Sequence, residues 1–263
     1  MEEILLERAE LLSLLEMKGI DQVIGISQDQ LPSPESFERQ IILDDGRSRL
    51  LEQELLTVAE DHYEIDGQLD TMLSALADPQ TVLRLRRSAP ESDEEVWSWY
   101  FLTGSDMVQV ITSGSEQFEI GRLVDDDAAL AQIDEVFPLD PMPESTSYRA
   151  VVDQEDAELV RALADDWDEV PALTILEADG LSPVGAIGLF DDVTEPRWRG
   201  EIDFMACKDG EVKVHHRLLV LQGQEGSWLA WQDDPDKSEL QIQSASAGAL
   251  REQVQAYWSE VGP

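Results

Sequence analysis

The sequence predicts an α+β protein, in which a mainly antiparallel sheet is flanked by helices. Apolar residues recur at helical spacing through most of the first 78 residues. From residue 80 onward the pattern changes to alternation, with many β-branched and aromatic residues. The predicted strands are joined by short turns, which favours antiparallel neighbours. At 263 residues, 42% of them hydrophobic, the chain can bury a sizeable core.

Residues 1–78 are expected to form a helical N-terminal region that packs on the first sheet. A first helix begins near Ile4 and ends at Gly19, a residue type common just after helices. A second begins at Ser33-Pro34, because Ser33 can cap and Pro34 can occupy the first helical position, and it breaks near Asp44-Asp45-Gly46. Spacing predicts two more helices, on Leu50, Leu51, Leu55, Leu56 and Val58, and on Leu69, Met72, Leu73 and Leu76 before Pro79.

Residues 79–137 are expected to form a first α+β unit. The alternating pattern predicts strands at 81–87, 95–103, 106–112 and 117–124, with turns at Gly104-Ser105-Asp106 and Ser113-Gly114-Ser115. Asp125 then caps a helix that Pro138 closes. A linker is expected at 138–152, because 138–147 holds three prolines and has no periodicity.

A second α+β unit is expected at 153–263. Asp153 precedes a helix, and a final helix covers 246–260. Between them the pattern predicts strands at 171–177, 184–190, 200–207, 211–221, 227–232 and 239–243. The order helix, strands, helix thus occurs in 68–137 and again in 153–261, which indicates an internal pseudo-twofold repeat of element order. Two unrelated α+β halves would give the same order.

Charge is the strongest bulk property of the chain. Its 57 acidic and 18 basic residues give a net charge of −39, spread along the sequence. Such a field repels nucleic acid and anionic membranes, and the only basic cluster, Arg84–Arg87, lies on a predicted strand. Three explanations remain open: an acidic surface suited to a salt-rich host, a chaperone or adaptor that keeps a client soluble, or a mimic or immunity protein that covers a basic partner.

No motif for nucleotide binding or nucleophilic catalysis is present in the sequence. It has no phosphate-binding Gly-Lys-Ser/Thr loop, no Gly-x-Gly-x-x-Gly turn after a strand and no Gly-x-Ser-x-Gly elbow. Gly185-Ala186-Ile187-Gly188 lies in a strand pattern, where glycine more often marks a bulge or close packing. We therefore expect no catalytic residues and no cofactor, and a hydrolase without a recognisable motif is the third alternative.

A metal site is not expected either. His215 and His216 are neighbours on a predicted strand, so they point to opposite faces and cannot bind one metal ion in the usual way, and His62 is far away in sequence. The acidic clusters at 125–127, 165–166 and 191–192 do not match a calcium-binding loop.

The single cysteine, Cys207, excludes an internal disulfide and fits a reducing cytoplasm. The N-terminus lacks the basic and apolar segments of a secretory signal, which also predicts a cytoplasmic protein.

The aromatic segment 96–102 is the candidate partner-binding site. On a strand, Trp97, Trp99 and Phe101 share one face. If that face is open, the three side chains form an apolar patch of the kind that binds proteins. If both faces are covered, the segment is a central strand of the core. Trp198 and Trp228, near later strand starts, allow the same two interpretations.

Residues 4–137 resemble a known family. The segments that carry the resemblance are Leu11-Leu12 to Gly19-Ile20, the helix reaching Leu50 to Leu56, Ile65 to Asp70, Leu76 to Pro79, and the strand Val82 to Arg86. This pattern resembles the N-terminal half of EspG-type chaperones of ESX (type VII) secretion. The resemblance implies a protein without enzymatic activity that holds secreted substrates of the PE/PPE kind in the cytosol. The chain departs from that family in being far more acidic.

The sequence thus predicts a non-enzymatic, acidic binding protein of the cytoplasm, acting as a chaperone or adaptor for a secreted or aggregation-prone client. An apolar strand or helix-end patch would bind the client, and surrounding carboxylates would exclude wrong partners and oppose aggregation. The expected partner is a protein, not a nucleic acid or a membrane. The oligomeric state is left open.

Overall fold

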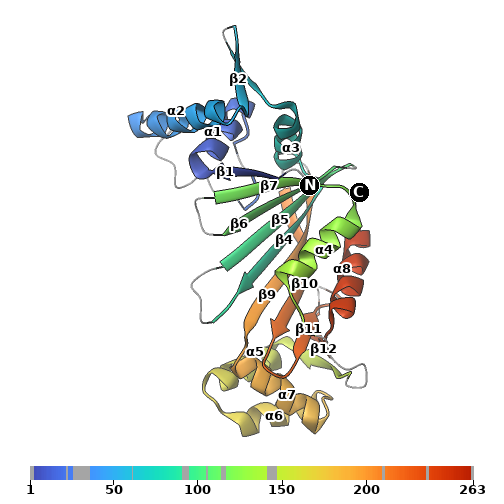
Figure 1. Cartoon of the computed structure of the whole chain (residues 1–263). Helices are drawn as coiled ribbons and strands as arrows, with labels where there is room; N and C mark the ends of the chain where they lie inside the picture. Colours follow the sequence, from blue (N-terminus) through green and yellow to red (C-terminus); the bar gives the residue numbers. More distant parts are fainter. Residues whose placement is uncertain are drawn as a thin grey trace.

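A computed structural model of the chain describes residues 3–21, 23–25, 36–60, 62–90, 95–104, 106–113, 117–140, 147–208, 211–234 and 237–261. These residues form eight helices, a ten-stranded sheet and a separate two-stranded sheet, which confirms the α+β class (Figure 1). The helices are α1 Arg8–Lys18, α2 Phe37–Glu52, α3 Gly67–Ala77, α4 Asp126–Val136, α5 Gln154–Asp165, α6 Glu169–Ala178, α7 Pro183–Thr194 and α8 Ala247–Val261. The strands are β1 Glu3–Glu7, β2 Leu56–Ala59, β3 His62–Ile65, β4 Thr81–Ser88, β5 Glu95–Thr103, β6 Asp106–Ser113, β7 Gln117–Leu123, β8 Arg149–Asp153, β9 Trp198–Lys208, β10 Glu211–Gln222, β11 Ser227–Trp231 and β12 Glu239–Ser244.

The large sheet consists of two antiparallel meanders that meet at its centre. Its strand order is β1-β7-β6-β5-β4-β9-β10-β11-β12-β8, so the first strands of the meanders, β4 and β9, pair with each other. Strands β1 and β8 form the two edges. The order of strands is thus similar on both sides of the β4–β9 pair. A true internal duplication stays a prediction.

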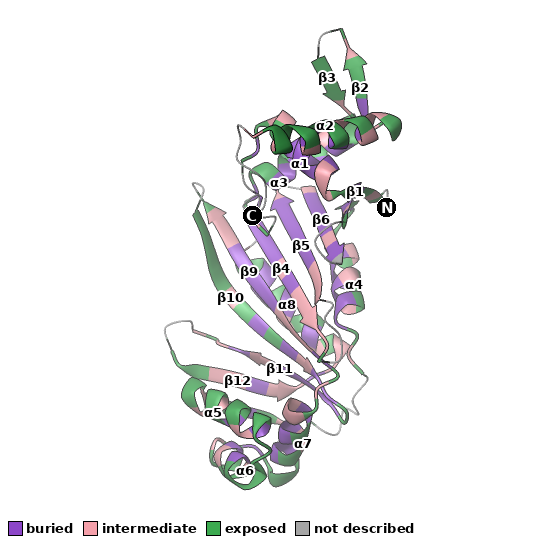
Figure 2. Ribbon diagram, turned by 90° about the vertical axis from the view of Figure 1, so that its left-hand side faces the viewer, coloured by how far each residue is buried: buried purple, intermediate pink, exposed green. Residues whose placement is uncertain are grey.

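The two faces of the sheet are covered differently. Helices α4 and α8 pack on one face over a core that contains Tyr100, Ile202 and Leu218. On the other face, α1 and α3 cover the end formed by β1, β7, β6 and β5, and α5, α6 and α7 cover the end formed by β11, β12 and β8. Between these two groups, in the middle of that face on β4, β9 and β10, no helix of the described residues lies over the sheet (Figure 2). This open middle is where a partner could reach the sheet.

Two predicted strands, 171–177 and 184–190, are wrong, because these residues lie on helices α6 and α7. The β-branched residues of both segments gave a strand pattern, but packing against the sheet determines the outcome. The start of α7 carries a helix signal, since the Ser182 hydroxyl accepts a hydrogen bond from the Gly185 amide at 3.2 Å and Pro183 follows the cap. A Cβ on Gly185 would lie 2.8 Å from Tyr148 Cδ1, so this glycine allows the helix to approach closely.

The predicted helix break near Asp44-Asp45-Gly46 is also wrong. Helix α2 continues through Gly46, because α1 crosses it there and a Cβ would lie 2.2 Å from the Ala9 carbonyl oxygen. Ser13 of α1 strengthens the crossing by donating a hydrogen bond to the Leu43 carbonyl at 2.9 Å. The Ser33-Pro34 helix start lies outside the described residues, and Ser36 caps the described part of α2.

The predicted third helix, on Leu50 to Val58, is wrong beyond Glu52. Glu54 has a φ of 60°, in the left-handed region, and turns the chain out of α2. Residues 56–59 and 62–65 then pair as the β2–β3 hairpin, which projects from the helical end in Figure 1. Leu55 and Leu56 contact the core beside α1 and α3. The leucine spacing therefore predicted correctly that these residues face the core, but predicted the wrong secondary structure for them.

Two short edge strands were not predicted. Strand β1 pairs with β7 and β8 with β12, and each is five residues long. Strand β8 lies within the interval 138–152 that was expected to be a linker, of which residues 141–146 lie outside the described part. The turn at Ser113-Gly114-Ser115 also lies mostly outside the described part.

The domain boundaries stay predictions. Within the described ranges, no helix is both long enough and apolar enough to cross a membrane.

Candidate functional site

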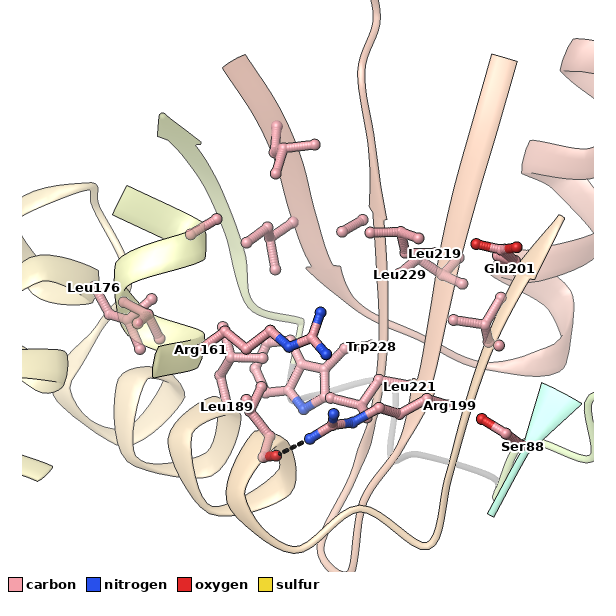
Figure 3. A pocket seen from close by; sticks show the side chains of 18 of the residues that line it. Ser88, Arg161, Leu176, Leu189, Arg199, Glu201, Leu219, Leu221, Trp228 and Leu229 are labelled. Atoms are coloured by element: carbon pink, nitrogen blue, oxygen red, sulfur yellow. Dashed lines mark hydrogen bonds between the residues drawn. The ribbon is translucent and has the colours of Figure 1, made fainter. Parts of the chain in front are cut away.

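A cavity of about 440 Å³ opens on the second face of the sheet, between the sheet and the helices α5, α6 and α7. We call it the pocket. Its lining is mainly apolar: Leu221, Trp228 and Ala230 come from the sheet, and Val160, Leu176 and Leu189 come from the helices (Figure 3). Leu219 lies at the side of the pocket nearest the open middle of the sheet and keeps 40% of its surface exposed. A mainly apolar cavity at the surface is typical of a binding site.

The Trp228 side chain is held in place by the buried carboxylate of Asp192. The Trp228 indole Nε1 donates a hydrogen bond to Asp192 Oδ2 at 2.9 Å, and the Glu225 amide donates one to Asp192 Oδ1 at 3.1 Å. Burial raises the pKa of Asp192, and these hydrogen bonds partly oppose that rise. Tyr148 stacks on the indole with ring centroids 6.1 Å apart. The base of the pocket is therefore preorganised and needs no partner to order it.

A ladder of charged side chains crosses the open middle of the sheet beside the pocket. Arg84, Asp203 and Arg217 stand opposite one another on β4, β9 and β10. The Asp203 side chain is fully buried and accepts hydrogen bonds from both arginines, with 2.6 Å between Arg217 Nε and Asp203 Oδ1. The hydrogen bond to Asp203 raises the pKa of Arg217, against the effect of burial. The buried carboxylate thus has two cationic partners, as a buried charge requires.

Trp97 continues this ladder toward β5. Arg86 Nη2 lies 2.5 Å from Glu95 Oε1, and this ion pair raises the pKa of Arg86 and lowers that of Glu95. The Trp97 indole Nε1 donates to the same carboxylate at 3.1 Å. The guanidinium carbons of Arg84 and Arg86 lie 5.8 and 5.2 Å from the centroid of the Trp97 ring, within cation–π range. Trp97 is therefore a partly exposed aromatic residue with a fixed orientation.

The structure separates the three residues of the candidate partner-binding site. Trp97 is partly exposed at the open middle of the sheet. Trp99 and Phe101 lie on the same strand face but are buried in the core beneath α1 and α3. The rings of Trp97 and Trp99 are stacked, with centroids 5.7 Å apart, so the aromatic stripe joins that core to the open surface. A partner-binding role for these three residues stays a prediction.

Of the two later tryptophans, Trp228 lies in the pocket and Trp198 in the core beside Phe137. Sequence reasoning did not identify the residues that surround Trp228. Leu219 and Leu221 belong to an ordinary strand pattern. Arg199 begins a strand and Arg161 lies on a helix, and no local motif connects them. The one available signal was the Ser182-Pro183 helix start, which would have placed a helix, and hence a wall, at 183–194.

The histidines do not form a catalytic or metal site in the described residues. His216 stacks on Tyr257 with ring centroids 4.1 Å apart, and its Nε2 lies 2.9 Å from the exposed Glu260 carboxylate. His215 points elsewhere, with its ring centroid 6.5 Å from that of His216, and His62 lies on the β2–β3 hairpin. Across the described ranges, no group of three or more His, Cys, Asp or Glu residues is placed to hold a metal ion.

Comparison with known proteins shows a fold relative. No family matches the chain as a sequence, and no curated protein sequence matches it. The structure is similar, with a TM-score of 0.73, to the Mycobacterium tuberculosis type VII secretion system chaperone EspG5, solved in complex with a PE25–PPE41 dimer. The match covers 97% of this chain and 95% of that chain, at 16% sequence identity. The resemblance expected for residues 4–137 is thus confirmed at the level of the fold and extends over nearly the whole chain.

Proposed function

We propose that this protein is a non-enzymatic chaperone or adaptor that binds a secreted or aggregation-prone protein through the pocket and the open middle of the sheet. The observation that carries the proposal is the position of the pocket. It is apolar, preorganised and accessible, and it lies on a sheet face whose two ends are covered by helices while no described helix covers the middle. An interface of this kind derives its affinity from apolar anchors placed in a fixed concave surface.

The fold relative narrows the class of client that we propose. EspG5 is described as a type VII secretion chaperone in complex with a PE25–PPE41 dimer. We propose that the client of this chain is likewise a secreted protein of the PE/PPE kind, held in the cytosol before export. No cofactor and no catalytic residue enter this proposal.

The net charge of −39 serves this function as a solubilising surface. A protein that covers an apolar segment of its client must keep the complex from aggregating, and dispersed carboxylates repel other copies of the same complex. The pocket lining departs from this surface, since its apolar residues include Leu219, Leu221 and Leu240. We therefore expect binding to be dominated by apolar contact and to depend only modestly on salt.

Leu219→Asp tests the proposal, with Val151→Asp as the matched control. Leu219 is 40% exposed at the pocket; Val151 is 44% exposed on β8 of the same sheet and alternates with Val152, which faces the core beneath α5–α7. We expect Leu219→Asp to weaken client binding by about tenfold or more, because a carboxylate placed among apolar anchors must be desolvated. Val151→Asp should retain the client. The measurement is affinity capture from the native host with each variant.

Running the capture at two salt concentrations separates the proposal from the immunity or mimic alternative. Raising the salt from about 0.1 M to about 1 M shortens the screening length from about 10 Å to about 3 Å. A client held by apolar contact stays bound, whereas a basic partner held by surface carboxylates is released. Equal retention by Leu219→Asp and Val151→Asp, or steep release by salt, would show that the pocket is not the client site.

A further inference from the structure

Two arginines at the pocket, Arg161 and Arg199, lack acidic partners among the residues that the structure describes. The chain has 57 acidic and 18 basic residues, and most of its arginines form an ion pair. Ion pairs with a carboxylate are formed by Arg39, Arg47, Arg49, Arg84, Arg86, Arg122, Arg197, Arg217 and Arg251. Among the described residues Arg87 and Arg149 also show no such pair, and of these four arginines only Arg161 and Arg199 line the cavity proposed to bind the client.

The two guanidinium groups converge from different elements. Arg161 reaches in from α5 and Arg199 from β9, and Figure 3 shows both beside the Trp228 indole. Arg199 is fixed by a hydrogen bond that its Nη2 donates to the Val193 carbonyl at 2.7 Å. Its other guanidinium donors have no hydrogen-bond acceptor among the described residues. A planar guanidinium offers five N–H donors, so donors remain for a ligand.

The electrostatic balance at this point of the pocket is positive. Burial lowers the pKa of Arg199, the nearby charge of Arg161 lowers it further, and Asp165 opposes this. The other carboxylates that approach the pocket are occupied: Glu201 lies 3.8 Å from Arg84, and Asp192 accepts hydrogen bonds from Trp228 and a backbone amide. The positive charges of Arg161 and Arg199 repel each other in this partly desolvated site, and an anion bound between them would relieve that repulsion.

We infer that the pocket selects a client segment that carries an aspartate or glutamate next to bulky apolar side chains. The carboxylate accepts hydrogen bonds from Arg161 and Arg199, while the apolar side chains fill the cavity lined by Leu221, Ala230 and Leu240. This inference rests on the proposed function and specifies the chemistry of the client. Charge complementarity supports it, because a lysine or arginine brought to this place would meet two cations, and because an acidic segment needs local arginines to approach a chain of net charge −39.

The test begins with a defined probe, a display library of random peptides. The library is selected in parallel on the wild-type protein and on Leu219→Asp, and sequences enriched only by the wild type are kept. We expect these to combine an acidic residue with neighbouring Leu, Phe, Met or Trp. Each enriched peptide is then synthesised with its Asp or Glu and, as a matched partner, with Asn or Gln, and affinities are measured by fluorescence anisotropy.

The variants compared are the double variant Arg161→Gln/Arg199→Gln and a control, Arg122→Gln/Arg251→Gln. Both remove two positive charges, but the control arginines pair with Asp106 and Asp134 away from the pocket. We expect the acidic peptide to bind the wild type and the control about tenfold more tightly than its amide partner, since hydrogen bonds to a charged group are the stronger ones. The Arg161→Gln/Arg199→Gln variant should bind the two peptides equally.

The outcomes separate this inference from the proposed function. Equal binding of the acidic and amide peptides to the wild type overturns the inference but leaves the pocket as the client site. A preference for the acidic peptide that survives in Arg161→Gln/Arg199→Gln also overturns it, because other groups would then bind the carboxylate. If no peptide prefers the wild type over Leu219→Asp, the proposed function fails, and the inference fails with it.

Discussion

We expect Asp203→Ala to lower the free energy of unfolding by about 3 kcal/mol, although it removes only one small side chain. The Asp203 carboxylate is fully buried and is the shared acceptor of Arg84 and Arg217, so its loss leaves Arg217 without an ion-pair partner and Arg84 with only Glu201, 3.8 Å away, at the centre of the sheet. The two arginines are partly exposed, at 30% and 50% of their side-chain surface, and water can reach them. The cost is therefore placed at the lower end of the range for breaking a buried pair.

Asp106→Ala is the matched control for this measurement. Asp106 also pairs with one arginine, Arg122, but both side chains are exposed, and an exposed pair contributes about 1 kcal/mol or less. Urea unfolding of both variants gives the comparison, with stability taken from the linear dependence on denaturant. A cost for Asp203→Ala no greater than that for Asp106→Ala would show that the ladder does not hold the central strands together.

Phe101→Ala should destabilise the protein by about 3–5 kcal/mol, the range for removing a fully buried aromatic side chain. Phe101 has no exposed surface and packs in the core beneath α1 and α3. Trp97→Ala removes a larger side chain from the same strand face, but it should cost less, because part of that side chain already faces solvent. It should instead weaken client binding, since Trp97 borders the open middle of the sheet.

The comparison of Phe101→Ala with Trp97→Ala tests the aromatic stripe as a binding site. Urea unfolding measures the first effect, and affinity capture of the client from the native host measures the second. Client binding unchanged in Trp97→Ala would remove the stripe from the client surface. A small stability loss in Phe101→Ala would contradict the burial of this strand beneath α1 and α3.

Local sequence patterns predicted the elements that depend on local physics. Alternation over 81–124 gave the first meander, because each strand has one face on the α4–α8 core and short turns fix its neighbours. Asp125 predicted the start of α4, and its carboxylate accepts a hydrogen bond from the Ala128 amide at 2.8 Å. These features lie within a few residues of each other, so the sequence carries them directly.

The elements that were mispredicted depend on contacts distant in sequence. Gly46 is compatible with a helix because Ala9 and Ser13 of α1 occupy the space beside it. Gly185 of α7 leaves room for the Tyr148 ring, which packs against the helix there. The sequence around residue 185 does not show this contact, because Tyr148 is distant in the chain. Leu56 is buried and Leu55 partly buried beside α1 and α3, and burial alone does not distinguish helix from strand.

The pocket could not be predicted for the same reason. Its walls come from strands and helices that are distant in sequence and are brought together by the β12–β8 and β4–β9 pairings. Trp97 and Trp228 were recognisable as aromatic candidates. Arg161 and Arg199 were not, because an unpaired cation is defined by the absence of a neighbour, which a sequence does not show.

Site-specific photo-crosslinking tests the central claim most directly. A benzoylphenylalanine is introduced in place of Leu219 at the pocket and, separately, in place of Val151, and each protein is irradiated in its native host. The proposal predicts an adduct from position 219 with a secreted protein of the PE/PPE kind, and none from position 151. A client that co-purifies with the protein but forms its adduct only from position 151, or from neither position, would contradict binding at the pocket.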